Sequence, residues 1–392
     1  HLEEIRALEK RYVMQTYGRN EIALVSGEGA RLRDSEGKEY IDLTSGIGVN
    51  CLGYHHPALS AAISDQAQKL MHCSNLFYSE PMAQVAEHLV KSTGLSRVFF
   101  ANSGAEANEA MIKTARKYSS DRYGKDRYKI ITLRQSFHGR TMTTLMATGQ
   151  DKFHQYFYPL PEGFAYVEAG DLAQFKSCAD EHVCAVIMEM IQGEGGVLPL
   201  DQAFVQEVSA YCKAHDILVC VDEVQTGIGR TGTLFCYEQY GIEPDIVSMA
   251  KGLGGGVPIG AILCGEKCAD TLQPGQHGST FGGNLLACRA AQTVLSVVDQ
   301  PQFLASVKEK GEYIREQLLA MHSPAIREVR GMGLMLGIGV DPQKRSDYVR
   351  ALQEKGVLVL TAGEDTIRLL PPLVITKEDI DQALACMKEV LK

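Results

Sequence analysis

The stretch RVFFANSGAEANEAMIKTARKYSSDRYGKDRYKIITL, residues 97–133, decides the fold class of this chain. It begins with an apolar strand pattern at Arg97–Ala101 and ends with another at Lys129–Leu133. Between them, small and apolar residues recur at helical spacing over residues 105–118. The order strand, helix, strand predicts two parallel strands joined by a crossover helix.

The same alternation extends on both sides of this stretch. Further strand patterns are VCAVIME, ILVCVD, DIVSM and IGAILCG, and helical patterns cover residues 81–93, 202–215 and 234–240. Continuous apolar strands separated by helices are typical of a parallel sheet that helices cover on both faces. We therefore expect the α/β class.

The pattern changes near residue 284. Two long helical patterns follow, then the strand patterns VRGMGLMLGIGV, VLVLTA and TIRLLPPL, and a closing helix, which together predict a smaller α+β domain. A turn-rich antiparallel pair at residues 27–43 is expected to pack with it. The predicted division is an N-terminal segment (1–60), a large domain (61–284) and a small C-terminal domain (285–392).

Composition and charge exclude several classes of protein. The chain has 392 residues, of which 45% are hydrophobic and 22% charged, unlike a disordered or fibrous chain. Its 39 basic and 48 acidic residues give a net charge of −9, without any run of Lys or Arg. We therefore expect neither nucleic acid nor an anionic membrane as a partner.

Apolar runs and cysteines bear on localisation and metal binding. The longest apolar runs are far shorter than a membrane-spanning helix, and the charged start HLEEIRALEKRY contains no secretory signal. The chain does not begin with Met, so removal of a preceding segment stays open. Eleven cysteines without a C-x-x-C pair favour reduced thiols in the cytoplasm, and we expect no metal site.

Ligands bind at the carboxyl ends of the strands in an open parallel sheet, so the polar residues after each strand are site candidates. Ser103, Gly104 and Ala105 follow the first strand and start a helix, where free amides and the helix dipole favour a phosphate. A capping turn without any ligand would also explain Ser and Gly there.

Two charged residues follow other strands. Asp222 ends ILVCVD, and a buried carboxylate there needs a partner such as a protonated pyridinium nitrogen. Lys251 follows DIVSM, where a lysine with a lowered pKa can form a Schiff base, although a strand-end lysine is more often a solvated charge. The glycines come after Lys251, which excludes a P-loop.

Two loops complete the candidate site. SFHGRT brings Phe137 and Arg140 after a strand, and HGSTFGGN at residues 277–284 brings hydroxyl groups and glycines. A phosphate-binding helix start, a strand-end acid, a reactive lysine and an aromatic ring are together what a pyridoxal 5'-phosphate site requires.

With these motifs the chain resembles class III (subgroup II) aminotransferases of fold type I over essentially its whole length. The matching segments, in family order, are GIGVNCLGYHHP, RVFFANSGAEANEA, SFHGRT, IQGEGGV, DEVQTGIGRTG, AKGLGGGVPIGA and STFGGN. The resemblance implies a mainly parallel seven-stranded sheet, pyridoxal 5'-phosphate as cofactor, and a homodimer with shared active sites.

The resemblance also implies the contacts of the cofactor. They are Lys251 at the aldehyde, Asp222 at the pyridinium nitrogen, Gln225 near the ring hydroxyl, Phe137 stacked on the ring, Ser103, Gly104 and Ala105 at the phosphate, and Thr280 at the phosphate in the partner subunit.

For substrates, the resemblance implies transfer of the δ-amino group of N2-acetylornithine to 2-oxoglutarate. The products are N-acetylglutamate 5-semialdehyde and glutamate, in arginine biosynthesis. Arg140 is implied at the α-carboxylate of acetylornithine, with Ser279 reaching it across the dimer. Arg368 is implied at the α-carboxylate of glutamate and 2-oxoglutarate, with Glu194 pairing with it when an ω-amine is bound.

The chain departs from the family pattern at Met190 and Leu285, where a proline is common, and neither position bears on the chemistry. Gly46 stands where ornithine aminotransferases tend to have a tyrosine, which favours an acylated donor. Succinylornithine, succinyl-diaminopimelate, ornithine and 4-aminobutyrate stay open as donors, and a dialkylglycine-type decarboxylase as another reaction class. A Rossmann dehydrogenase is disfavoured because Gly331, Gly333 and Gly337 lie within a strand pattern. The direction of the reaction and a dimer or tetramer also stay open.

Overall fold

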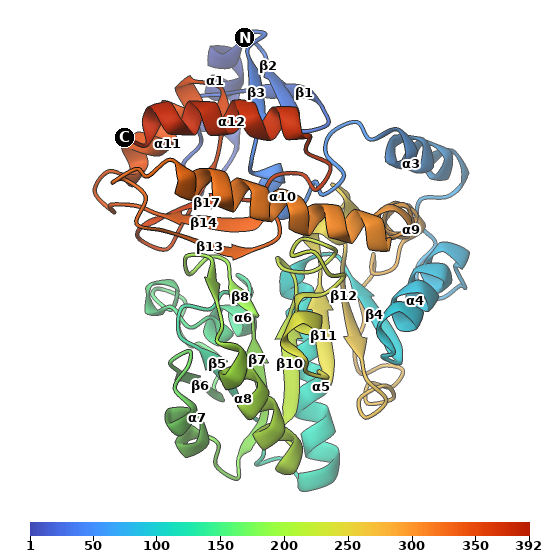
Figure 1. Cartoon of the computed structure of the whole chain (residues 1–392). Helices are drawn as coiled ribbons and strands as arrows, with labels where there is room; N and C mark the ends of the chain where they lie inside the picture. The colour runs from blue at the N-terminus through green and yellow to red at the C-terminus, as the bar shows by residue number, and fades with distance from the viewer.

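A seven-stranded sheet forms the centre of the lower part of the molecule in Figure 1. The structure is a computed structural model that describes residues 1–392. The strand order is β4-β12-β11-β10-β7-β5-β6. The strands are β4 (Arg97–Ala101), β5 (Lys129–Leu133), β6 (Phe164–Val167), β7 (Val183–Met188), β10 (Leu218–Asp222), β11 (Ile246–Met249) and β12 (Gly260–Cys264).

The sheet is mainly parallel, as predicted. Only β12 runs against its neighbours, because it pairs antiparallel with both β11 and β4, whereas the other pairs are parallel. The apolar pattern alone predicts a parallel β12, and this expectation is wrong. Residues 250–259, which connect β11 to β12, are too few for a parallel crossover.

Helices cover both faces of this sheet (Figure 1). Leu218 of β10 belongs to the apolar cluster that contains Met111 of α5 (Gly104–Tyr123). The next residue, Val219, belongs to the other cluster, which contains the buried face of α8 (Gln202–Ala214). The strand is apolar from Leu218 to Val221 because its successive side chains enter two different cores.

Local sequence explains where the helices begin and end. Ser103 caps α5 by accepting a hydrogen bond from the Glu106 amide, and Gly124, with φ +83°, ends it. The helix predicted over residues 81–93 is α4 (Glu80–Thr93). The helix predicted over residues 234–240 is instead a short 3₁₀ helix, η2 (Cys236–Tyr240).

Two smaller sheets form the upper part in Figure 1. VRGMGLMLGIGV forms a hairpin of two strands, and VLVLTA divides into two strands that join different sheets. One sheet has the order β13 (Glu328–Met332), β14 (Met335–Gly339), β17 (Thr366–Leu369) and β16 (Leu360–Ala362). The other has the order β1 (Leu24–Glu28), β2 (Arg31–Asp34), β3 (Glu39–Asp42) and β15 (Val357–Leu358).

The two ends of the chain share one of these sheets, because β3 pairs in parallel with β15. This pairing joins the N-terminal segment to the C-terminal part of the chain. The division into segments 1–60, 61–284 and 285–392 stays a proposal. At the second boundary, α9 (Leu285–Val298) also packs against α3 (Pro57–Lys69) and α4 of the larger part. It therefore connects the two parts of the molecule.

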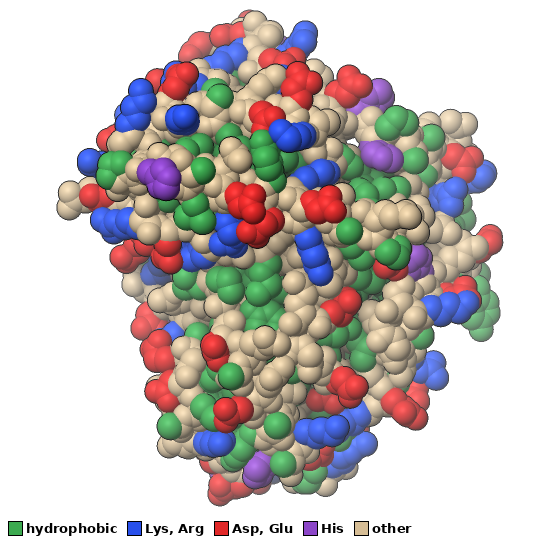
Figure 2. All heavy atoms as spheres, viewed as in Figure 1, with side chains coloured by type: hydrophobic (Ala, Val, Ile, Leu, Met, Phe, Trp, Pro, Cys, Tyr) green, Lys and Arg blue, Asp and Glu red, His purple; other side chains and the backbone are tan.

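The remaining elements are short or lie on the surface. They are α1 (Leu2–Tyr12), α2 (Ser45–Gly48), α6 (Met142–Ala147), η1 (Asp151–Phe153), α7 (Leu172–Cys178), β8 (Ile191–Gln192), β9 (Leu198–Pro199), η3 (Lys251–Gly254), α10 (Pro301–Ala320), α11 (Arg345–Glu354) and α12 (Lys377–Val390). None of the helices combines the length and the apolar character that crossing a membrane requires. On the face drawn in Figure 2, acidic and basic side chains are interspersed.

Gly311 tests how closely α10 packs on the small sheet. A Cβ at this position would lie 2.1 Å from the Gly333 oxygen, and the three atoms nearest to it all belong to the Gly333 backbone. In an open helix Gly→Ala stabilises, but here we expect Gly311→Ala to lower the free energy of unfolding by about 1–3 kcal/mol. Thermal unfolding measures this. Gly18→Ala is the control, since nothing lies within 4 Å of a Cβ there. A stabilised Gly311→Ala protein would contradict the packing.

Candidate active site

A cavity of about 600 Å³ opens at the carboxyl ends of the central strands. Most of the site residues expected from the sequence line it, although they come from distant segments of the chain. They are Ser103, Gly104, Ala105, Phe137, Arg140, Glu194, Asp222, Gln225 and Lys251. The topology therefore brings the predicted residues to one place, as the rule for open sheets requires.

Three expected residues do not line this cavity. Arg368 lies behind it and contacts two residues that do. Thr280 is exposed, and the Ser279 hydroxyl accepts hydrogen bonds from the Asn102 side chain (3.1 Å) and the Gly282 amide (3.1 Å). The roles expected for Ser279 and Thr280 lie in a partner subunit and stay predictions.

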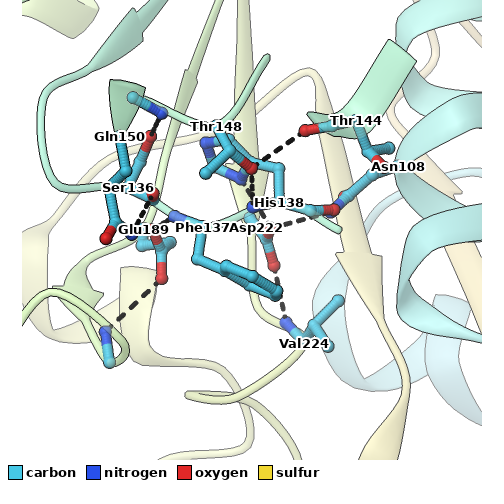
Figure 3. Close-up of polar contacts among 12 residues, drawn as sticks. Asn108, Ser136, Phe137, His138, Thr144, Thr148, Gln150, Glu189, Asp222 and Val224 are labelled. Atoms are coloured by element: carbon cyan, nitrogen blue, oxygen red, sulfur yellow. Dashed lines mark hydrogen bonds and ion pairs between the residues drawn. The ribbon is translucent and has the colours of Figure 1, made fainter. Parts of the chain in front are cut away.

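Asp222 is the centre of a buried hydrogen-bond network (Figure 3). Its Oδ2 accepts from Asn108 Nδ2 (2.8 Å) and from His138 Nδ1 (2.8 Å), and its Oδ1 accepts from the Val224 amide (3.0 Å). The donors come from α5, from the segment after β5 and from the turn after β10. Because the residue is only 4% exposed, these bonds hold the carboxylate in one orientation.

His138 stabilises the negative charge of Asp222. Burial of the imidazole alone would lower its pKa, but the hydrogen bond to Asp222 and the charge of Asp222 outweigh burial and raise the pKa of His138. Asn108 also donates to the His138 carbonyl oxygen at 2.8 Å. The raised pKa favours the protonated ring, which compensates part of the negative charge buried at the end of β10.

Glu189, which follows β7, is a second buried carboxyl group beside this network. Burial, together with the nearby charge of Asp222, raises the pKa of Glu189 to about 8. Its Oε1 accepts the amide of Phe137 at 2.9 Å, and so it holds the segment that bears the Phe137 ring (Figure 3). At neutral pH this carboxyl group is mostly protonated and uncharged.

Sequence reasoning did not single out four residues that line the cavity: Tyr17, Asn108, His138 and Glu189. A signal existed for Glu189, because it ends the apolar run VCAVIM as Asp222 ends LVCV. Asn108 and His138 lie inside motifs that were recognised. Tyr17 belongs to an N-terminal segment without any periodic pattern, and only the fold brings it to the cavity.

Lys251 begins η3 directly after β11. Burial lowers the pKa of Lys251, and the positive charge of Arg368 acts in the same direction, while Glu194 opposes both. Its φ of +43° lies in the left-handed region that non-glycine residues rarely adopt. The thiol of Cys51 donates a hydrogen bond (3.1 Å) to the carbonyl oxygen of Gly252, the residue after Lys251, and so holds this turn. The arrangement favours a neutral, nucleophilic amine.

Arg368 and Glu194 form an ion pair of 2.7 Å at the wall of the cavity. Arg368 is 3% exposed, and its Nη1 also donates to Gln225 Oε1 at 3.1 Å, whereas its Nε has no partner. Burial alone would raise the pKa of Glu194, but the charge and hydrogen bond of Arg368 outweigh it and hold this pKa below the ordinary value. A buried guanidinium with a free N–H group can bind a carboxylate by donating hydrogen bonds to it.

The start of α5 forms another wall. The first amides of a helix have no acceptor within the helix, and those of Gly104 and Ala105 lie at the cavity. A Cβ on Gly104 would lie 2.7 Å from a methyl group of Val224, so a side chain there would collide with the cavity wall. These features fit a phosphate group.

Arg140 lies at the exposed side of the cavity. Its guanidinium stands 5.6 Å from the centre of the Phe137 ring and 4.3 Å from that of Phe153. It takes part in no ion pair of this structure, in contrast to Arg368. Two arginines are therefore available to the cavity: Arg140 lines it and is unpaired, and Arg368 lies behind it and is already paired with an acid.

Comparison with known proteins agrees with this arrangement. The chain belongs to the family described as aminotransferase class-III, which matches residues 12–391. An acetylornithine aminotransferase from Haemophilus ducreyi is 50% identical over 391 residues, which cover 99% of this chain and 98% of that protein. An acetylornithine aminotransferase from Caldanaerobacter subterraneus subsp. tengcongensis is also 50% identical, over 98% of both chains.

Solved structures are similar over the full length. An ornithine aminotransferase from Toxoplasma gondii ME49 has a TM-score of 0.96 at 32% identity and covers 100% of this chain and 95% of its own. Another structure of that enzyme is described with partial occupancy of PLP at the active site. An N-acetylornithine aminotransferase from Stenotrophomonas maltophilia K279a has a TM-score of 0.85 at 38% identity, covering 98% and 97%. The predicted family and fold type I architecture are confirmed.

The burial of Glu189 predicts a dependence of stability on pH. The folded protein holds a proton on this carboxyl group up to about pH 8, whereas the unfolded chain releases it near 4.5, so stability falls as pH rises between these values. Glu189→Gln removes this loss. We expect its melting temperature, relative to the wild type, to increase from pH 5 to pH 8.

Glu316→Gln is the control, because Glu316 is exposed on α10. A difference in melting temperature between Glu189→Gln and the wild type that is constant over this pH range would show that Glu189 is not protonated in the folded protein.

Proposed function

We propose that this protein transfers the δ-amino group of N2-acetylornithine to 2-oxoglutarate in a ping-pong reaction that uses pyridoxal 5'-phosphate. The observation that carries the proposal is the buried Arg368–Glu194 pair at the cavity that holds Lys251. A site that binds a dicarboxylate in one half-reaction and an ω-amine in the other needs a cation that can be masked. The acetylornithine aminotransferases at 50% identity support the choice of donor.

The residues of the cavity fit this cofactor. The amides at the start of α5 would hold its phosphate, Asp222 would pair with the protonated ring nitrogen, and Phe137 would lie against the ring. Gln225 would lie near the ring hydroxyl. When bound, the cofactor supplies an aldehyde that exchanges amines and a ring that takes up the electrons released at the substrate carbon.

Lys251 is the group that moves protons. Its lowered pKa favours the neutral, nucleophilic amine that reaction with the cofactor's aldehyde requires. Nζ of Lys251 would take the proton from Cδ of acetylornithine. Asp222, held by Asn108 and His138, would keep a proton on the ring nitrogen of the bound cofactor.

The two arginines divide the substrate carboxylates. Arg140 would bind the α-carboxylate of acetylornithine, because it is exposed at the cavity and has no acidic partner. Arg368 would bind the α-carboxylate of glutamate or 2-oxoglutarate after Glu194 moves away. Since the Glu194 side chain is 31% exposed and Arg368 only 3%, the acid is the partner with room to move.

The absence of a side chain at Gly46 favours an acylated donor, because no tyrosine is present there to hold a free α-amino group. Gly46 has φ +63°, a backbone conformation that is strained for any other residue. Succinylornithine, succinyl-diaminopimelate and 4-aminobutyrate stay alternatives. The accessible Arg140 speaks against 4-aminobutyrate, which has no α-amino-acid group at the end opposite its amine.

Assembly and localisation belong to the same proposal. Apolar side chains that are unusual on a monomer surface lie near the loop with Thr280, and a homodimer would bury them. They are Leu76 (87% exposed), Phe77 (67%), Tyr78 (105%) and Phe281 (58%). Ser279 and Thr280 would then reach the partner's site. All eleven cysteines are free thiols, which supports a reducing cytoplasm.

A panel of amine donors tests the proposed reaction. We expect the highest kcat/KM with acetylornithine, lower values with succinylornithine and ornithine, and little activity with 4-aminobutyrate. Lys251→Ala should abolish turnover with every donor, since no other amine lies at the cavity. Lys310→Ala is the matched control, because burial also lowers the pKa of Lys310, on α10. Equal kcat/KM for 4-aminobutyrate and acetylornithine would refute the donor assignment.

Replacing each arginine should affect one substrate. We expect Arg140→Ala to raise KM for acetylornithine and Arg368→Ala to raise KM for 2-oxoglutarate, each by roughly ten- to a hundredfold, as loss of a charged hydrogen bond predicts. The other KM should change much less. Steady-state kinetics with both substrates varied measure this. If both variants raised the same KM, the division of carboxylates would be wrong.

A further inference from the structure

Arg230, in the segment GIGRTG, is the largest fully buried side chain of the protein. It is 1% exposed and forms no ion pair with a carboxylate. Its Nη1 donates to the carbonyl oxygens of Leu334 (3.0 Å) and Pro371, and its Nη2 to the Ser45 hydroxyl (3.3 Å). Burial lowers the pKa of Arg230 to about 10, so the group is still charged at neutral pH.

Two partners of Arg230, Leu334 and Pro371, lie at the ends of two strands of the small sheet. Leu334 directly precedes β14, and Pro371 follows β17, the strand that bears Arg368. These two strands are neighbours in the small sheet, with Leu336 opposite Leu369. One guanidinium therefore holds the ends of both strands.

Arg230 itself belongs to the segment that follows Asp222 at the end of β10 and also contains Gln225. This segment is rigid, because the buried Glu223 accepts hydrogen bonds from the Thr226 hydroxyl (2.7 Å) and from the amides of Cys236 (3.0 Å) and Tyr237 (2.8 Å). The side chain of Arg230 thus connects the cofactor end of the large sheet to the strand with Arg368.

The backbones also meet at this point. The Leu334 amide donates to the Arg230 carbonyl oxygen at 3.0 Å. A Cβ on Gly333 would lie 2.6 Å from the carbonyl carbon of Thr231, so no side chain fits between the two segments. The contact between the two parts of the molecule is direct here and leaves little freedom for sliding.

A buried guanidinium without a carboxylate partner is costly, because carbonyl dipoles replace its hydration only in part. Apolar residues could join the two segments at lower cost. A planar fork with five donors does what apolar packing cannot, since it fixes the distance and the direction of several oxygen atoms at once.

We propose that Arg230 is a positioning residue that sets the place of Arg368 relative to Gln225 and Lys251, and thereby the affinity for the dicarboxylate substrates glutamate and 2-oxoglutarate. The inference rests on the proposed role of Arg368 as the carboxylate-binding residue. Geometry carries the inference, because two contacts join the segment after β10 to the small sheet. Gln225 of this segment contacts Arg368 of β17 at 3.1 Å, and Arg230 of the same segment contacts the Leu334 carbonyl oxygen before β14.

The glutamate half-reaction tests this inference. Holoenzyme is mixed with glutamate alone, and the change in cofactor absorbance gives an apparent dissociation constant and a limiting rate. We expect Arg230→Met to weaken glutamate binding by about tenfold or more and to change the limiting rate by less than about threefold, because chemistry at Lys251 is untouched. Arg230→Lys, which keeps the charge but not the fork, should lie between.

Arg315→Met is the matched control. Arg315 also donates to two main-chain oxygens of the small sheet, those of Val329 and Gly331 (both 2.6 Å), but it lies within α10 and does not contact the segment after Asp222. We expect it to lower the melting temperature without changing glutamate affinity by more than about twofold.

Unchanged glutamate binding in Arg230→Met would overturn the inference, and so would an equal loss in Arg315→Met. A parallel fall of binding, limiting rate and cofactor affinity would also overturn it, since that is the effect of a purely structural residue. If Arg230→Met does not fold, Arg230→Lys decides by the same criteria. The half-reaction requires no amine donor, so a wrong donor assignment does not affect it. A wild type without any response to glutamate would refute the proposed function instead.

Discussion

The end of β10 imposes a constraint on the whole site, because Asp222 is a carboxylate that is only 4% exposed and needs hydrogen-bond donors from the protein. Three donors surround it, from Asn108, His138 and the Val224 amide. They require α5, the segment after β5 and the turn after β10 to meet at one point. The strand order of the large sheet achieves this, and the cavity forms around the same point.

Charge is distributed unequally around this centre. Glu189 is mostly protonated at neutral pH because burial, together with the nearby charge of Asp222, raises its pKa, while Glu194 is ionised because it lies beside Arg368. The two acids are only a few residues apart in the chain and have opposite environments. Lys251 lies between these regions, and its amine responds to both. Burial acts on all of these groups, and the charge of the nearest neighbour decides how far burial shifts the pKa of each one.

Much of the local structure could be predicted from sequence. The expected strands at residues 97–101 and 129–133 are β4 and β5 without any shift, and Ser103 and Gly104 begin α5 as expected. Apolar runs, caps and turn glycines are local signals, so one sequence suffices to recognise them. The reversed direction of β12 was not recognised, because an apolar strand has the same composition in either direction.

The candidate site, like the fold, could be predicted from the sequence only in part. Asp222, Lys251 and Phe137 follow strands and belong to motifs, so the sequence by itself determined the chemical groups of the site and the family. Only the tertiary structure decided which groups are paired: Arg368 with Glu194, Asp222 with His138, and Arg230 with the ends of β14 and β17. The physical reason is that pairing and burial depend on distances between residues far apart in the chain, and a strand pattern contains no information about those distances.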